Sequence, residues 1–291
     1  MKFAHLNVEG QSTPRLAVTI GDSVLFLDEV MEDAPRDLQE LLDAGGTEYD
    51  RVRAHVDNAR AQKVSMTPLD GLRYASAVLR PPQIIAIGAN YVAHSSELKL
   101  RSESAATVFS LWPNSLTGHE STVTWPKDLA TQVDYEAEVG VIIGKAAHNV
   151  SVHDALDHVF GYTVVNDITA RDLQFSEAQW SRCKSFDGFT PTGPIVVTAD
   201  EIGDPQDLWL TTHVDGRILQ DASSGDMVRT VAELIAFLSS TATLLPGTLI
   251  STGSPGGAGY SRKPQVFLRD GSTVTVSIDK IGYLTTYCRE I

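Results

Sequence analysis

The pattern of apolar and polar positions changes character partway along the chain. In the first part, residues 3–10 and 14–30 alternate like short strands joined by turns. Residues 37–45 and 48–63 have the spacing of amphipathic helices, and the first of them ends at a glycine. We therefore expect a small α/β domain over residues 1–78.

Residues 79–83, LRPPQ, mark the end of this domain, because two adjacent prolines interrupt regular structure. Beyond them, short β-rich runs follow one another with few helices between. Helices are expected at residues 92–100, 169–180 and 226–245. Since helices do not alternate regularly with the strands, we expect a mixed, mostly β (α+β) domain over residues 79–291 and not a doubly wound parallel sheet.

The composition narrows the partners that the chain can have. Of 291 residues, 37 are Asp or Glu and 23 are Lys or Arg, and the net charge of −14 argues against nucleic acid and against anionic membrane surfaces. No segment has the ~18 consecutive apolar residues of a membrane span, and the first residues lack the apolar stretch of a signal peptide. Cys183 and Cys288 match no metal-ligand spacing, so we expect reduced thiols in a cytoplasmic protein.

Acidic residues alternate with apolar ones in residues 133–145, VDYEAEVGVIIGK. In a strand, Asp134, Glu136 and Glu138 would share one face, because successive side chains point to opposite sides. Like charges this close resist ionisation when they are buried. Two interpretations follow: either the face is exposed to solvent, or a divalent cation binds between the carboxylates.

Another acidic residue, Asp167, lies in residues 161–174, GYTVVNDITARDLQ, where an apolar strand gives way to a predicted helix. Functional side chains often occupy such junctions, but Asp is also a common N-cap. Arg171 and Gln174 follow four and seven residues later and share a helical face with Asp167. Arg171 there forms either a surface ion pair or a contact with an anionic substrate.

Further segments carry candidate groups for catalysis. His94 and Glu97 are three residues apart on a predicted helix; a carboxylate beside an imidazole suits a general base, although a surface contact has the same spacing. Lys184, in SRCKSFDGFTPTGP, either binds a carbonyl or carboxylate or extends to the surface. Residues 251–261, STGSPGGAGYS, lack the lysine of a phosphate-binding loop, so a flexible or tight-turning loop beside a ligand is the better interpretation.

These segments, in this order, resemble the fumarylacetoacetate hydrolase family over residues 80–291. The resemblance rests on five strings: IGANYVAHSSE, VDYEAEVGVIIGK, FGYTVVNDITARDLQ, KSFDGFTPTGP and STGSPGGAG. It implies a β-roll of mixed sheets around one metal site, preceded by the small variable domain of bacterial members. It also implies a homodimer and a bound Mg²⁺ or Mn²⁺.

The resemblance assigns the acidic residues to the metal site. Glu136, Glu138 and Asp167 match the metal ligands of the family. Asp134 matches a position that supports a ligand or a loop. By this interpretation, the like charges gather because a divalent cation binds among them.

The remaining candidates match catalytic and substrate-binding positions of the family. His94 and Glu97 match a dyad that activates water, and Lys184 matches a lysine near the carbonyl or carboxylate of the substrate. The residues that match ligand contacts are Arg171, Gln174 and Ser254, the last of which is threonine in many members. Many relatives also have a lysine near the position of Leu111, and its absence here implies a less acidic or more apolar substrate tail.

The activity that the resemblance implies is metal-dependent hydrolysis of a carbon–carbon bond in an acylpyruvate-like 1,3-diketo acid. Relatives that decarboxylate oxaloacetate-like acids, or isomerise unsaturated hydroxy-dioates, share this kind of site, and the sequence separates these activities poorly. A metal-stabilised binding protein without turnover is an alternative of a different class. In each enzymatic case the expected partner is a small keto acid.

Overall fold

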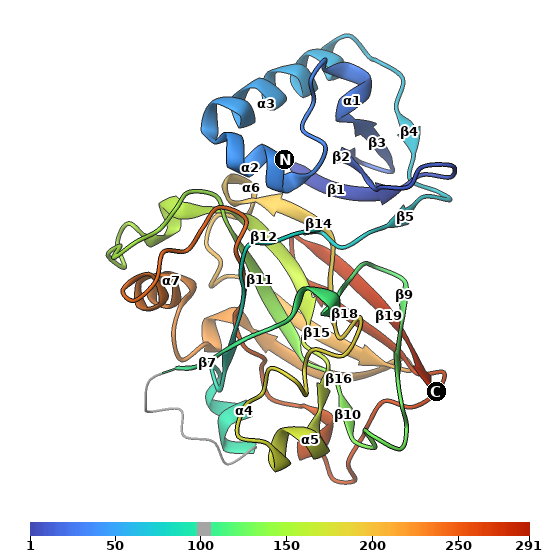
Figure 1. Ribbon diagram of the computed structural model, residues 1–291, viewed down its shortest axis with the longest axis vertical. Coiled ribbons are helices and arrows are strands. Elements are labelled where there is room, and N and C mark those ends of the chain that lie inside the picture. The colour runs from blue at the N-terminus through green and yellow to red at the C-terminus, as the bar shows by residue number, and fades with distance from the viewer. Residues whose placement is uncertain (98–105) are drawn as a thin grey trace.

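The N-terminal part of the chain is an α/β unit at one end of the long axis of the molecule (Figure 1). The computed structural model describes residues 1–97 and 106–291. The unit contains strands β1 (Lys2–Asn7), β2 (Arg15–Ile20), β3 (Ser23–Phe26), β4 (Thr67–Pro68) and β5 (Arg73–Tyr74), and helices α1 (Leu27–Val30), α2 (Leu38–Ala44) and α3 (Gly46–Ala61). Asp37 caps α2 by accepting the backbone N–H of Glu40, and Gly45 ends the helix, as predicted.

The rest of the chain is mostly strands. They are β6 (Ile84–Gly88), β7 (Thr107–Ser110), β8 (Leu116–Thr117), β9 (Ser121–Trp125), β10 (Val133–Asp134), β11 (Ala137–Ile143), β12 (Val159–Asn166), β13 (Thr169–Ala170), β14 (Thr190–Thr198), β15 (Trp209–Val214), β16 (Arg217–Ser223), β17 (Leu249–Ser251), β18 (Thr273–Ile278) and β19 (Gly282–Glu290). One large sheet continues from the N-terminal unit, because β1 pairs antiparallel with β14, where Phe3 lies opposite Val196.

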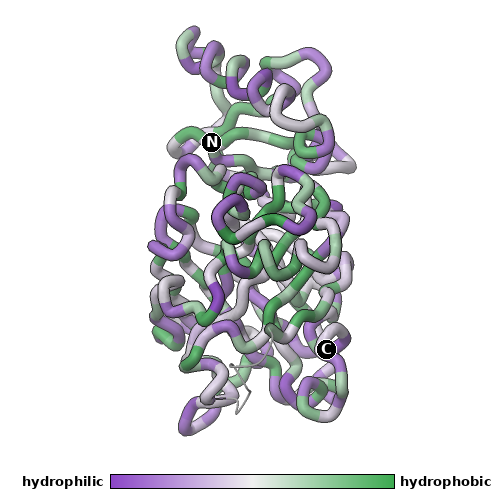
Figure 2. Tube along the Cα trace, turned by 90° about the vertical axis from the view of Figure 1, so that its left-hand side faces the viewer, coloured by the Kyte–Doolittle hydropathy of each residue, from purple (hydrophilic) through white to green (hydrophobic). Residues whose placement is uncertain are grey.

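Two sheets enclose the core. The main path of the large sheet is β4-β3-β2-β1-β14-β12-β11-β17-β6-β7, and the smaller sheet has the order β16-β15-β18-β19-β9. Most pairs are antiparallel, but β17 with β6, β14 with β8 and β19 with β9 are parallel. The sheets pack together through β11, β12 and β14 on one side and β15, β18 and β19 on the other. In Figure 2, hydrophobic residues run through the interior of the trace, whereas hydrophilic residues cover much of the helix at its top. The mixed, mostly β prediction is confirmed.

Helices in this part are short and lie around the sheets. They are α4 (Val92–Glu97), α5 (Arg171–Ser176), α6 (Ala199–Ile202), α7 (Val231–Ser239) and the 3₁₀ segments η1 (Pro113–Ser115), η2 (Ala155–His158), η3 (Ser224–Asp226) and η4 (Gly259–Ser261). No helix in the described part of the chain combines the length and the apolar composition that a bilayer crossing requires.

Each predicted helix of this part differs in extent from the helix in the structure. Thr169 and Ala170, predicted as helical, form β13 because they pair with β10. The predicted helix 226–245 is reduced to α7, because Thr230 and Glu233 form a capping box that fixes its first residue at Val231. The predicted helix 92–100 reaches Glu97, and its remaining residues lie outside the described residues.

Residues 133–145, predicted as one strand, form two. β10 ends at Asp134 and β11 begins at Ala137, because β10 pairs with β13 whereas β11 pairs with β12. In the gap, the backbone N–H of Glu136 donates to the side-chain oxygen of Asn166 over 3.1 Å. The prediction of a single strand face carrying three carboxylates is therefore wrong in its local structure.

A buried histidine, His5, ties β1 to the start of α2. Its Nδ1 donates to the carbonyl of Ser76 over 3.2 Å, and its Nε2 accepts the backbone N–H of Leu38 over 3.0 Å. Since one ring nitrogen donates and the other accepts, the ring is neutral. Burial lowers the pKa of His5 from 6.5 to about 4.

We expect His5 to make the protein less stable as the pH falls from 6.5 to 4. In this range the unfolded chain binds a proton at His5, whereas the folded ring resists protonation until about pH 4, so the free energy of unfolding decreases by about 3 kcal/mol. Urea unfolding of the wild type and of His5→Gln at pH 7 and pH 4.5 measures this contribution. Equal losses of stability in the two proteins would contradict the prediction.

Candidate metal centre and active site

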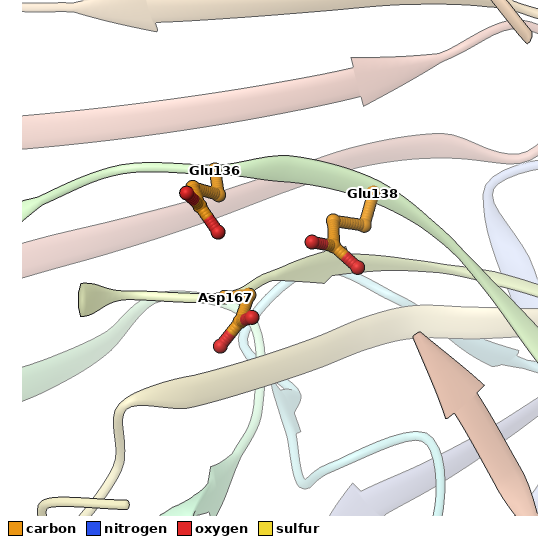
Figure 3. Close-up of side chains that lie close together, drawn as sticks. All are labelled: Glu136, Glu138 and Asp167. Atoms are coloured by element: carbon orange, nitrogen blue, oxygen red, sulfur yellow. The ribbon is translucent and has the colours of Figure 1, made fainter. Parts of the chain in front are cut away.

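Three carboxylates meet inside the large sheet. One oxygen from each of Glu136, Glu138 and Asp167 lies within 4.8 Å of the other two. Figure 3 shows the three side chains directed toward a common space. Each residue is at most 3% exposed. This burial excludes a solvated acidic face and agrees with the alternative, a group of cation ligands.

Strand pairing brings these carboxylates together. Ala137 lies opposite Asn166 in the β11–β12 pair, so their neighbours Glu136 and Asp167 meet at the end of the ladder. The backbone N–H of Asp167 donates to the carbonyl of Glu136 over 2.9 Å. The N-cap of the following helix is Ala170, so the alternative role of Asp167 as an N-cap is wrong.

Lys184 lies between two of the carboxylates. Its ammonium group donates to Glu136 Oε2 over 2.7 Å, to Asp167 Oδ2 over 2.6 Å and to the hydroxyl of Thr169 over 2.8 Å. Burial disfavours the charged form, but Asp167 and Glu136 outweigh it and raise the pKa of Lys184. The alternative of a surface lysine is wrong, since the residue is 2% exposed.

Arg171 is completely buried behind the cluster. Its Nε donates to Asp134 Oδ2 over 2.9 Å, its Nη2 to Glu136 Oε1 over 2.6 Å and its Nη1 to Gln174 Oε1 over 2.9 Å. The alternative of a surface ion pair is therefore wrong. These bonds fix the orientation of the Glu136 carboxylate, and Asp134 supports the arginine.

The buried negative charges in and around the carboxylate cluster outnumber the buried positive charges. Two cations, Lys184 and Arg171, face four buried carboxylates, which are Asp134, Glu136, Glu138 and Asp167. Burial raises the pKa of Asp167 to about 6, against the attraction of Lys184. Burial, together with the charges of Asp167 and Glu136, raises the pKa of Glu138 well above its usual range. An ion with two positive charges would neutralise the group.

The donor atoms fit a hard divalent cation such as Mg²⁺ or Mn²⁺. Asp167 Oδ1 is buried without a hydrogen bond. Both hydrogen bonds to the Glu138 carboxylate reach one oxygen, Oε2, which accepts from Ser251 Oγ over 2.5 Å and from the N–H of Gly253 over 2.8 Å. Carboxylate oxygens are the ligands that these ions prefer. Glu136, Glu138 and Asp167 are therefore the residues that could hold one.

His94 and Glu97 lie in different surroundings although both belong to α4. His94 is buried, with Nε2 3.3 Å from Glu136 Oε1, and its Nδ1 has no hydrogen-bond partner. The exposed carboxylate of Glu97 accepts the N–H of Gly257 over 3.0 Å and the hydroxyl of Ser261 over 2.9 Å. His94 thus faces the carboxylates, whereas Glu97 fastens α4 to the glycine-rich loop.

A small cavity lies beside the carboxylates. Its volume of about 10 Å³ is close to the room that one water molecule needs. Besides two of the carboxylates, its lining includes His94, Phe109, Gln174, Trp180, Lys184 and Ser254. The rings of Phe109 and Trp180 form an aromatic wall, with centroids 5.5 Å apart. Leu111 is buried in the hydrophobic core nearby and does not line this cavity.

The loop that follows β17 turns tightly, which is one of the two alternatives, flexible or tight-turning, that the sequence left open. Gly253 has φ +99°, and a Cβ on it would lie 2.7 Å from the Cβ of Asn90. The N–H of Gly259 donates to Asp134 Oδ1 over 2.8 Å, and a Cβ there would lie 1.7 Å from the carbonyl oxygen of Val266. Only glycine allows the backbone to approach the carboxylates this closely.

Sequence reasoning missed Gln220, which contacts the backbone beside the carboxylate cluster. This residue of β16 is 1% exposed, and its side-chain oxygen accepts the N–H of Ala137 over 3.0 Å, directly between two of the carboxylates. Its segment, RILQDAS, has the composition of a half-exposed strand. A single glutamine in such a strand carries no signal of a role at a site on β11.

Comparisons with known proteins relate this chain to one family. The family model described as fumarylacetoacetate (FAA) hydrolase C-terminal matches residues 83–288. An uncharacterized protein of Staphylococcus epidermidis is 41% identical over 225 residues, which are 77% of this chain and 73% of that protein. The family match therefore includes every candidate residue of the site, from His94 to Ser254.

Solved structures share the whole fold. Fumarylacetoacetate hydrolase from the psychrophilic Exiguobacterium antarcticum is 32% identical, with a TM-score of 0.85 over 100% of both chains. Maleylpyruvate hydrolase from Sphingobium sp. SYK-6, in complex with manganese(II) and pyruvate, is 26% identical, with a TM-score of 0.82 over 100% of this chain and 99% of that one. Because the family model matches most of the chain and these structures match all of it, this protein belongs to the fumarylacetoacetate hydrolase family.

Proposed function

We propose that this protein is a divalent-metal-dependent hydrolase that cleaves a carbon–carbon bond in an acylpyruvate-like 1,3-diketo acid. The observation that carries the proposal is the buried group of Glu136, Glu138 and Asp167, whose charge the neighbouring cations compensate only in part. The imidazole of His94 lines the cavity beside this group. The related maleylpyruvate hydrolase was solved with manganese(II) and pyruvate, a cation and a keto acid of the kinds proposed here.

The three carboxylates hold Mg²⁺ or Mn²⁺, which when bound supplies Lewis-acid polarisation of the keto-acid oxygens. His94 takes a proton from a water molecule, and the resulting hydroxide attacks the distal carbonyl carbon of the substrate. The bond from this carbon to the adjacent CH₂ group breaks, and its electron pair stays with the pyruvate fragment. His94 returns the proton to that fragment, so that pyruvate and a carboxylic acid leave.

Two further side chains orient the substrate. Gln174 presents its amide N–H groups to the cavity, because its oxygen already accepts from Arg171. Lys184 places a positive charge beside the reacting group. Glu97 acts differently from the dyad expected from the family resemblance: its hydrogen bonds to the glycine-rich loop hold α4, and thereby His94, in place.

A turnover assay in ¹⁸O-labelled water tests this function. Metal-stripped protein is given acetylpyruvate, a longer acylpyruvate or oxaloacetate, each with and without Mg²⁺ or Mn²⁺. We expect label in the released carboxylic acid only when the metal is present. Release of carbon dioxide from oxaloacetate without hydrolysis of either acylpyruvate would identify a decarboxylase. An unsaturated hydroxy-dioate is offered in a parallel assay, where its rearrangement without hydrolysis of either acylpyruvate would identify an isomerase.

His94→Gln separates catalysis from metal binding. Loss of a general base typically costs 10²–10⁴-fold in rate, so we expect hydrolysis to fall by at least about a hundredfold. Mn²⁺ should bind this variant nearly as well as the wild type, because the three carboxylates are unchanged. Calorimetric titration with Mn²⁺ and the ¹⁸O assay measure the two effects. A parallel loss of both would show that His94 supports the metal site and not the proton transfer.

We also propose that the protein works as a homodimer in the cytoplasm on a small keto acid, without nucleic acid or membrane partners. The family resemblance supports the dimer, and the net charge of −14 supports the absence of polyanionic partners. Light scattering at micromolar protein concentration tests the dimer: a molar mass near 31.5 kDa, that of one chain, would overturn it.

A further inference from the structure

Gln220 makes four side-chain hydrogen bonds, one within the smaller sheet and three that join this sheet to the metal centre. Its side-chain oxygen accepts the N–H of Ala137 over 3.0 Å and the hydroxyl of Thr212 over 2.8 Å. Its side-chain nitrogen donates to Ser254 Oγ over 2.8 Å and to the carbonyl of Pro255 over 2.9 Å. Two donors and two acceptor positions are all that a glutamine amide offers, so this buried group is fully used.

These partners leave only one orientation for the amide. The backbone N–H of Ala137 can only donate, so it requires the oxygen of Gln220, and the carbonyl of Pro255 can only accept, so it requires the nitrogen. A flipped amide would place its NH₂ group against the N–H of Ala137 and its oxygen against the carbonyl of Pro255, so neither contact would be a hydrogen bond. The N–H group therefore points at Ser254, and the hydroxyl oxygen of Ser254 is an acceptor in this contact.

This contact decides how Ser254 can serve a ligand. Because Gln220 donates to the Ser254 oxygen, the hydroxyl proton is left for another acceptor. The carbonyl of Pro255 is 3.5 Å away, at the limit of a hydrogen bond, and already accepts from Gln220. Ser254 lines the cavity beside Glu138 and is 2% exposed. Its proton is thus available to an oxygen atom in the cavity.

We propose that Gln220 is a positioning residue that fixes Ser254 as a hydrogen-bond donor to a carboxylate or keto oxygen of the substrate. This inference rests on the proposed function, because the ligand is the keto acid of the same site. Gln220 touches no reacting atom and acts only through Ser254. The strand β16 thereby contributes to substrate binding from the smaller sheet, although the carboxylates belong to the large one.

A double-mutant cycle tests the coupling. The variants are Ser254→Ala, Gln220→Glu, Gln220→Met, and each Gln220 change combined with Ser254→Ala; Ser254→Thr, which keeps the hydroxyl, is the matched control. The readout is the affinity for pyruvate of protein loaded with Mn²⁺, measured by calorimetry. Thermal unfolding identifies the variants that fold, and two different replacements of Gln220 are used because one of them can fail to fold.

We expect Ser254→Ala and each Gln220 variant to bind pyruvate about tenfold more weakly, the loss of one hydrogen bond to a charged group, and Ser254→Thr to bind like the wild type. Each double variant should bind no more weakly than Ser254→Ala alone. Independent losses that multiply to about a hundredfold would overturn the inference, as would unchanged affinity in the Gln220 variants.

The same experiment distinguishes the inference from the proposed function. Coupled losses of pyruvate affinity in a protein that hydrolyses no acylpyruvate would support the role of Gln220 and overturn the proposed hydrolysis. Independent losses in a protein that hydrolyses acylpyruvates would support the proposed hydrolysis and overturn the role of Gln220. Absence of pyruvate binding by the Mn²⁺-loaded wild type would overturn the inference.

Discussion

Glu138→Gln is expected to abolish metal-dependent turnover and to leave the metal-free protein at least as stable as the wild type. Glu138 is 1% exposed, and its neighbours Glu136 and Asp167 repel its charge. The amide keeps an acceptor for Ser251 and Gly253 and can donate to the neighbouring carboxylates. An amide is a much poorer ligand for a hard cation than a carboxylate. Changes to residues that only support metal ligands cost roughly 10–100-fold in metal affinity or activity, so the loss of a ligand should reduce turnover by more than this.

Thermal unfolding with and without Mn²⁺ measures both parts of this prediction. A ligand at 100 times its dissociation constant stabilises a folded protein by about 2.7 kcal/mol, so the wild type should gain this amount and the variant almost none. Glu9→Gln, which removes an exposed carboxylate far from the site, is the matched control and should behave like the wild type. An unchanged Mn²⁺-induced gain in the Glu138 variant would remove this residue from the ligand set.

Arg171→Met is expected to destabilise the protein by about 3–5 kcal/mol, the usual cost of leaving buried charges without their partner. The guanidinium is 0% exposed and bonds to both Asp134 and Glu136. Removing it leaves two carboxylates in a region that already has excess negative charge. Urea unfolding at pH 7, extrapolated linearly to water, measures the loss.

The matched control for this change is Arg182→Met. Arg182 also pairs with a carboxylate, that of Glu177, but its side chain is 50% exposed, so its loss should cost no more than about 1 kcal/mol. Combining Arg171→Met with Asp134→Asn should restore part of the stability, because one of the abandoned charges is removed. Equal effects of the two single arginine changes would show that burial of the Arg171 pair does not matter.

The sequence pattern left a solvated face and a cation site open as alternatives for the acidic residues, and the family resemblance favoured the cation site. Glu136 and Glu138 lie in an apolar run and Asp167 at the end of an apolar strand, positions where charge is unusual. The glycines after β17 lie close together and indicated a special loop there, either flexible or tight-turning. In both cases the chemistry of a few adjacent residues restricts the structures that they can form.

Features that depend on contacts between distant segments could not be predicted. The break between β10 and β11 follows from pairing with two different partners, and only the fold reveals these. Glu97 has the spacing of a His94 partner, yet Gly257 and Ser261 lie closer to its carboxylate. Spacing along a helix defines which residues share a face, but it does not define which groups of other segments form hydrogen bonds with that face.

The pairing of β1 with β14 has a consequence for the modular organisation of the chain. Residues 1–78 supply the strand that covers one side of β14 at Val196 and Val197. If these residues were deleted, that stretch of β14 would have free N–H and C=O groups beside two valines, an edge to which the same edge of another molecule could add. The N-terminal unit therefore covers a strand edge of the large sheet, and we expect a replacement unit to keep this edge covered only if it also supplies a strand.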